Sequence, residues 1–188
     1  MAAVRAVTAG LHAALLLARG RREGMSYVET GLEGARRSFW AAAICLPAFV
    51  VLRLLDWADG ALPSAPAHAL ALGILGYATG WAGFAVATRP LVVLLGRAGR
   101  WPRFIAVWNW CNVAQYVLLL AAAVPDLLGA PAFVDQAAGL VALGWALWLE
   151  WYATRLALDL GALPAAGLVS LDVLIGVVVA GVTSALSG

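Results

Sequence analysis

Residues 104–124 read FIAVWNWCNVAQYVLLLAAAV, a run that contains no charged side chain. A helix that crosses the hydrocarbon core of a bilayer, about 30 Å thick, needs about 20 mainly apolar residues at a rise of about 1.5 Å each. The run has this length, and Pro125 and Asp126 follow it directly. It is therefore predicted to be a transmembrane helix, with several amide side chains inside it.

Comparable apolar stretches lie on both sides of this run, separated by short segments rich in Pro, Gly and Asp. Such short connections place consecutive helices antiparallel to each other. The sequence predicts an all-α integral membrane protein, with a bundle of five transmembrane helices over residues 38–188. The predicted spans cover approximately residues 38–55, 67–95, 104–124, 133–158 and 163–186.

The composition agrees with a membrane protein. Of the 188 residues 64% are hydrophobic and 12% are charged, with a mean hydropathy of +0.91, whereas soluble domains have about 25% charged residues. The net charge of +2 comes from scattered Arg without any Lys, which does not indicate nucleic-acid binding. The 2 Cys and 2 His are too few for a disulfide framework or a usual Cys/His metal site. With no recognisable catalytic motif present, no cofactor and no enzymatic activity are predicted.

The basic region 1–37 is predicted to be cytoplasmic. Its apolar part, residues 6–18, reaches only about 20 Å as a helix, which is too short to cross the bilayer. Because Arg residues stand at both ends of this part, we expect an amphipathic helix that lies at the membrane interface. Ser26 and Glu29 have the spacing of a capping box and are expected to start the next helix. The region is expected to contact anionic lipid or a cytoplasmic protein.

The arginines also predict the orientation of the chain, because cytoplasmic loops collect basic residues. They gather before the first span, after the second span and at the end of the fourth: Arg5, Arg19, Arg21, Arg22, Arg36, Arg37, Arg97, Arg100, Arg103 and Arg155. The opposite loops carry Asp56, Asp59, Asp126 and Asp135. The N-terminus is therefore predicted to be cytoplasmic and the C-terminus to lie on the other side of the membrane.

Polar side chains inside membrane spans are costly, and they are the first candidates for a functional site. Asn112, Glu150 and Asp172 all lie about 12–14 Å from the predicted cytoplasmic ends of their helices. We therefore expect a polar layer that several helices share, with Arg89 joining it if the second helix continues past Pro90. The predicted intramembrane polar cluster consists of Asn109, Asn112, Gln115, Glu150, Asp172 and Arg89.

Two functions fit this layer. In the first, amides and carboxyls hydrogen-bond between helices and hold together a membrane scaffold or interaction protein without catalytic activity. In the second, Glu150 or Asp172 takes up and releases a proton or cation in a small transporter or channel. We favour the first from the sequence and keep the second as the alternative; a homo-oligomer fits either. Small residues are expected to let helices approach closely: Gly73, Gly76, Gly80, Gly83 and Gly176.

Two segments carry a resemblance to a known family: WNWCNVAQYVLLLAAAVPDLLG at 108–129 and WALWLEWYATRLALDLG at 145–161. With the five-span layout and the last span ending near Gly188, the chain resembles the YIP (Ypt-interacting protein) superfamily of small membrane proteins. That resemblance implies a membrane-organising or partner-binding role and assigns no residue a function. The chain also resembles small proteins of Arg- and Ala-rich bacterial proteomes, which implies the bacterial cytoplasmic membrane, with the C-terminus in the periplasm.

Overall fold

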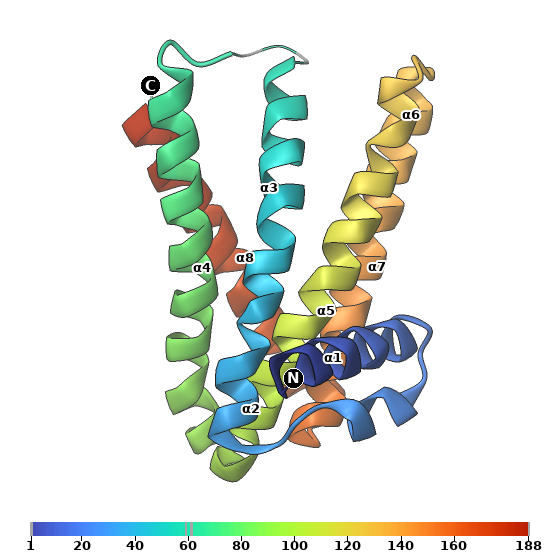
Figure 1. The fold of residues 1–188 in the computed structure, drawn as a ribbon, viewed down its shortest axis with the longest axis vertical. Coiled ribbons are helices and arrows are strands. Elements are labelled where there is room, and N and C mark those ends of the chain that lie inside the picture. The colour runs from blue at the N-terminus through green and yellow to red at the C-terminus, as the bar shows by residue number, and fades with distance from the viewer. Residues whose placement is uncertain (1, 59, 61, 188) are drawn as a thin grey trace.

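The computed structural model describes residues 2–58, 60 and 62–187, and this part of the chain forms helices and turns without any strand (Figure 1). Asp59, one of the acids expected in the loops opposite the arginines, lies outside the described residues. The five long helices are α3 (Trp40–Ala58), α4 (Pro66–Leu94), α5 (Trp101–Ala122), α7 (Ala132–Leu158) and α8 (Ala162–Ser187).

Each of these helices belongs to one of 5 segments that are long and apolar enough to cross a membrane. The all-α fold with five candidate spans is therefore confirmed. Pro66 and Pro102 stand in the first turns of α4 and α5, where proline replaces a backbone N–H that has no partner within the helix. Pro90 does not interrupt α4, which continues to Leu94 as expected.

Helix α5 is the central element of the bundle. It packs against α7, α3 and the N-terminal helices, while α8 packs mainly against α4 and also contacts α7. Residues 104–111 of α5 are all buried, and the span with the most amide side chains is therefore also the most enclosed of the five. In Figure 1 the α5–α7 pair leans away from α3 and α4 towards the end that carries α6 (Val124–Leu127).

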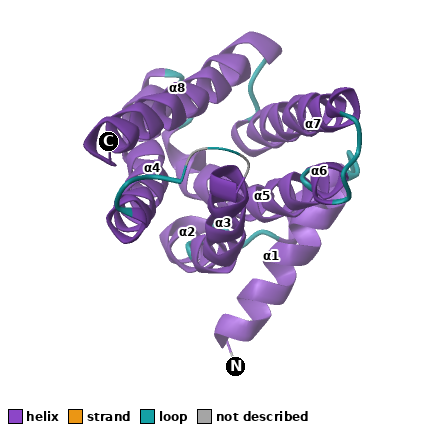
Figure 2. Cartoon of the chain, turned by 90° about the horizontal axis from the view of Figure 1, so that it is seen from above, coloured by secondary structure: helices purple, strands orange, loops and turns teal. Residues whose placement is uncertain are grey.

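The N-terminal helix α1 (Ala2–Ala18) lies across the bundle near one end, at a steep angle to the long helices (Figures 1 and 2). It packs on α5 so closely that a Cβ atom on Gly10 would overlap the indole ring of Trp110. The hydroxyl of Tyr152 on α7 donates a hydrogen bond of 2.7 Å to the carbonyl of Gly20. A short apolar N-terminal helix is thus confirmed, and its position across the bundle end suits a helix at the membrane interface.

The predicted capping box is wrong. A 3-10 helix, η1 (Arg22–Tyr27), contains Ser26, and the Ser26 hydroxyl donates a 2.7 Å hydrogen bond to the Glu23 carbonyl. The next helix, α2 (Gly31–Ser38), begins only after Thr30. Glu29 instead forms an ion pair of 3.4 Å with Arg37. The chain must turn at Gly31, whose φ is +86°, and this moves the helix start beyond the reach of Ser26.

The loops that carry arginine lie together at one end of the bundle. Arg97 directly precedes the 3-10 helix η2 (Ala98–Arg100), and Arg100 ends it. The two form ion pairs of 3.7 and 3.5 Å, respectively, with Asp159 in the α7–α8 turn. Arg103 at the start of α5 donates a 2.9 Å hydrogen bond to the carbonyl of Met25 in η1. Helix α1 lies near this end and the last turns of α8 lie at the other (Figure 1), as an odd number of crossings requires.

Candidate functional site

Glu150 on α7 and Asp172 on α8 form a pair of carboxyl groups in the middle of the bundle. The two side chains lie within hydrogen-bonding distance of each other. Glu150 is only 5% exposed. Because a carboxylate has no donor, a hydrogen bond between two carboxyl groups requires that one of them carries a proton. The two acids that share one predicted depth are thus brought together, as a site able to hold a proton.

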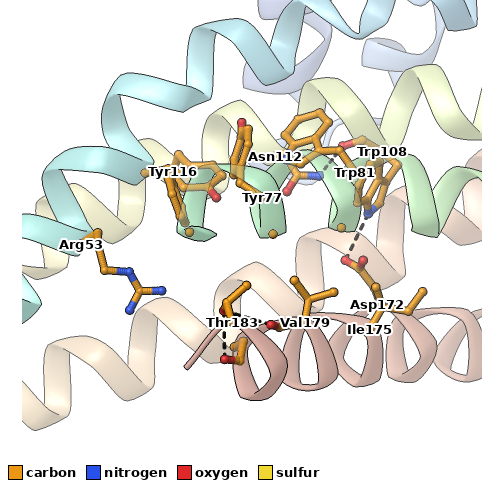
Figure 3. Close-up of a pocket in the computed structure, with 16 residues that line it drawn as sticks. Arg53, Tyr77, Trp81, Trp108, Asn112, Tyr116, Asp172, Ile175, Val179 and Thr183 are labelled. Carbon is orange, nitrogen blue, oxygen red and sulfur yellow. Dashed lines mark hydrogen bonds between the residues drawn. The ribbon is translucent and has the colours of Figure 1, made fainter. Parts of the chain in front are cut away.

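Trp108 on α5 fixes the position of Asp172. Its indole N–H donates a hydrogen bond of 3.2 Å to Oδ2 of Asp172 (Figure 3). The indole is itself held by Phe84, whose ring stacks on it at 4.4 Å between centroids, and by Trp81 at 5.2 Å in an edge contact. Sequence reasoning missed Trp108. The available signal was its position four residues before Asn112, which places both on one face of the helix.

Asp172 lies at the wall of a cavity of about 250 Å³ between α3, α4, α5 and α8 (Figure 3). We call it the aromatic cavity, because five aromatic side chains line it: Phe49, Tyr77, Trp81, Trp108 and Tyr116. Asn112 and Arg53 are further polar lining residues. Arg53 was not predicted as a site residue, because its place near the end of a span suggested a border position.

A second cavity, of about 490 Å³, continues the aromatic cavity towards the α3–α4 turn and the end of α8. The two share part of their lining: Arg53, Gly73, Ala180 and Thr183. Ser64, Ser184 and Ser187 line the outer part. Asp172 is therefore approached from the end of the bundle opposite the arginine-rich loops.

Glu150 lines a narrow crevice between α5 and α7 together with Trp108, Cys111 and Thr154, and this crevice has no room for a water molecule. The Oε1 atom of Glu150 is buried and has no hydrogen-bond donor within the described chain. The carboxyl pair thus joins a residue at an accessible cavity to a residue enclosed between α5 and α7, and Trp108 lines both places.

The amides of α5 point in three different directions. Asn109 is fully buried and donates a 2.7 Å hydrogen bond to the hydroxyl of Ser38 on α2. Gln115 donates one of 2.9 Å to the carbonyl of Ala146 on α7. Asn112 donates one of 3.0 Å to the carbonyl of Trp108 in its own helix and faces the aromatic cavity. Of the three amides, only Asn112 joins Asp172 at the cavity; the other two tie α5 to neighbouring helices.

Arg89 does not join the polar cluster, which corrects the expectation for this residue. Its guanidinium carbon lies 5.9 Å from the centre of the Trp101 ring, and the side chain is exposed. The reason is its position near the end of α4, where Trp101 begins the next long helix beside the arginine-rich loops. A guanidinium favours an aromatic face near water over desolvation in the bundle.

The glycines of α4 and α8 have two roles. A Cβ atom on Gly76 would lie 2.7 Å from Cγ2 of Thr183, so the predicted close packing is confirmed there, and one on Gly73 would lie 3.7 Å from Phe49. The same prediction is wrong for Gly80, Gly83 and Gly176, where an added Cβ would meet no atom within 4 Å. Gly80 and Gly176 instead line the aromatic cavity, where the lack of a side chain leaves space.

No group of three or more His, Cys, Asp and Glu side chains in the described ranges could hold a metal ion. The titratable or charged groups near the carboxyl pair are Cys111 and Tyr116 on α5, and the cavity adds Tyr77 on α4 and Arg53 on α3. The chain matches no family model, no curated protein and no solved structure. The resemblance to the YIP superfamily therefore stays a prediction.

Proposed function

We propose that the protein is a small membrane transporter in which the Glu150–Asp172 pair binds and releases a proton. One observation carries this proposal: two carboxyl groups lie within hydrogen-bonding distance inside the bundle, and one of them lines a cavity that leads to one end of the molecule. Intramembrane acids that face a cavity mark ion or proton pathways.

The position of the pair supports the exchange of a proton between two environments. Asp172 faces the aromatic cavity, and Glu150 faces the tightly packed crevice between α5 and α7. A proton that enters through the cavity reaches Asp172 and can pass to Glu150 over a single hydrogen bond. Release towards the arginine-rich end then requires that α5 and α7 separate beside Phe104 and Thr154, a second arrangement of the kind that alternating access needs.

Proton flux in proteoliposomes tests the proposal. Glu150→Gln and Asp172→Asn keep the size of each side chain and replace the titratable carboxyl group by an amide that does not titrate. Asp126→Asn is the control because Asp126 is exposed on α6. We expect an internal pH dye to report flux for the unchanged chain and for Asp126→Asn, and background flux for both site variants. Flux that survives in both site variants would overturn the proposal, provided that the variants melt at the temperature of the unchanged protein.

A membrane scaffold without catalytic activity is the second candidate, favoured by the hydrogen bonds that join different helices. Tyr77 on α4 donates one of 2.7 Å to the carbonyl of Ala42 on α3, and Asn109 and Gln115 bind α2 and α7. The resemblance to the YIP superfamily implies a role of this kind. If the amide variants lose stability and the unchanged protein shows no flux, this candidate replaces the transporter.

For the location of the protein we propose the bacterial cytoplasmic membrane, with the arginine-rich end in the cytoplasm. Four exposed arginines of the N-terminal region form no ion pair with the described residues and are available to anionic lipid or a cytoplasmic partner: Arg5, Arg19, Arg21 and Arg22. The aromatic cavity then opens towards the periplasm. Reporter fusions at the two chain ends test this, and an N-terminal reporter active only in the periplasm would reverse the orientation.

A further inference from the structure

The aromatic cavity has the chemistry of a cation-binding site as well as space for a small molecule. We propose that it binds a small organic ammonium ion, placed against the carboxylate of Asp172 and the surrounding aromatic rings. The inference rests on the proposed function in one respect: the same carboxyl group would hold either the proton or the ammonium ion. It adds the class of solute that the transporter would exchange for its proton.

The rings of the cavity form one continuous wall. Tyr77 lies at its centre, with ring centroids 4.9 Å from Phe49, 5.7 Å from Trp81 and 6.3 Å from Tyr116. Trp81 in turn lies 5.2 Å from Trp108. The wall therefore draws on α3, α4 and α5 and stands across the cavity from Asp172 on α8 (Figure 3). Aromatic faces attract a cation through their quadrupole, and more strongly where the cation has left water.

The charge distribution also favours a cation at this place. Asp172 is the acid among the described residues that line the cavity, and the donor that it receives from Trp108 is a neutral indole N–H. Arg53 and Thr183 line both cavities, so they mark the outer end of the aromatic cavity. Thr183 is three turns, or about 16 Å, along α8 from Asp172. Arg53 is moreover within 3.7 Å of Asp56, which partly neutralises it.

The lining distinguishes an organic cation from a metal ion. A hard metal ion needs several oxygen ligands at short distance. The side-chain oxygen atoms of the cavity lining belong to one carboxylate, one amide and the hydroxyls of Tyr77, Tyr116 and Thr183, and the Tyr77 and Thr183 hydroxyls already donate to backbone carbonyls. An alkylammonium ion has an apolar surface that suits the aromatic wall of the cavity. Gly80 and Gly176 on opposite helices keep the space open, since an added Cβ at either would meet no atom within 4 Å.

Three probes of similar shape test the inference on the full chain in detergent micelles. Choline carries the ammonium group, 3,3-dimethylbutan-1-ol is its uncharged carbon analogue, and glycine betaine adds a carboxylate. We expect calorimetry to show choline binding at least about tenfold more tightly than the uncharged analogue. Asp172→Asn should weaken choline binding at least about tenfold, because it removes the charge and keeps an oxygen that accepts from Trp108.

Variants of the aromatic wall give a second test that does not alter Asp172. Tyr116 lines the cavity, and its ring lies 6.3 Å from the Tyr77 ring between centroids. Tyr116→Leu should therefore weaken choline binding about three- to tenfold, and Tyr116→Phe, which keeps the ring, should leave it within about twofold. Gly80→Leu should abolish binding by filling the cavity, while Gly83→Leu, outside the cavity lining, should not.

Two results would overturn the inference. Equal binding of choline and its uncharged analogue would show an apolar cavity suited to a lipid chain. Tighter binding of betaine than of choline, lost in Arg53→Gln, would show a site for zwitterions. Failure of the transporter proposal looks different: choline then binds as expected while proton flux does not depend on Glu150 and Asp172. Flux that depends on the pair, without preference for choline, would reject this inference alone.

Discussion

The indole nitrogen of Trp108 on α5 lies 3.2 Å from Oδ2 of Asp172 on α8. This hydrogen bond joins the central helix to the last helix at the wall of the aromatic cavity. Trp108 is 5% exposed and is stacked on Phe84, so the donor has little freedom to turn away. The geometry makes Trp108 the residue that positions the carboxyl group.

Trp108→Phe is expected to release Asp172 while keeping an aromatic ring against Phe84. A hydrogen bond to a charged acceptor contributes about 1.5–3 kcal/mol, and the smaller ring adds a packing loss. We expect the melting temperature in detergent and the proton flux both to fall. Trp148→Phe is the control, because Trp148 is 38% exposed and stacks on Tyr152 outside this site. A Trp108 variant as stable and active as the control would contradict the positioning role.

Gly76→Ala is expected to force α4 and α8 apart. The new Cβ would lie 2.7 Å from Cγ2 of Thr183 and 3.1 Å from Cγ1 of Val179. Overpacking of this kind costs about 1–3 kcal/mol, measured as a lower free energy of unfolding. The control Gly83→Ala adds the same methyl group where no atom lies within 4 Å and should be neutral or slightly stabilising. Thr183→Ser removes the clashing methyl group, so the double variant should recover part of the loss.

The sequence predicted the fold well because span length and loop charge do not depend on how a helix is rotated about its axis. It also predicted that Glu150 and Asp172 lie at the same depth, because depth depends only on the direction of a helix and on the number of residues from its end. The prediction failed where the rotation of a helix about its axis and the packing of side chains decide which residues meet. Asn109 turns towards Ser38 and Arg89 towards Trp101, and a helix of uniform hydropathy carries no mark of the face that will be enclosed.

Gly10→Ala is expected to loosen the N-terminal helix, because the added methyl group would overlap the ring of Trp110 on α5. Helix α1 is held further by buried Ala13 and Leu17, so we expect displacement rather than unfolding of the bundle. Limited proteolysis near residues 19–22 should become several-fold faster. Thr8→Ala, at an exposed position of the same helix, should leave the rate unchanged. Equal rates for both variants would show that contact with Trp110 does not hold α1.

Ser38→Ala is expected to destabilise the junction of α2 and α5. Ser38 is 1% exposed and accepts the 2.7 Å hydrogen bond from Nδ2 of Asn109. Without this acceptor, a buried amide donor loses its partner, which costs about 1–3 kcal/mol. Ser170→Ala is the control, because Ser170 is exposed on α8. Adding Asn109→Leu should reduce the penalty, since it removes the stranded amide; a larger loss in the double variant would refute this account.

Substitutions of Asp159 separate backbone strain from ion pairing in the α7–α8 turn. Asp159 has a φ of +53°, which Gly and Asn accept readily and Ala accepts only at a cost of about 1 kcal/mol. Its ion pairs with Arg97 and Arg100 are largely exposed, so each contributes at most about 1 kcal/mol. The hydrogen bond from Arg97 to the backbone carbonyl of residue 159 remains in every variant.

We therefore expect Asp159→Gly and Asp159→Asn to have a free energy of unfolding close to that of the unchanged protein, and Asp159→Ala to be the least stable of the three. If Asp159→Asn were as unstable as Asp159→Ala, the ion pairs rather than the left-handed backbone would hold this turn.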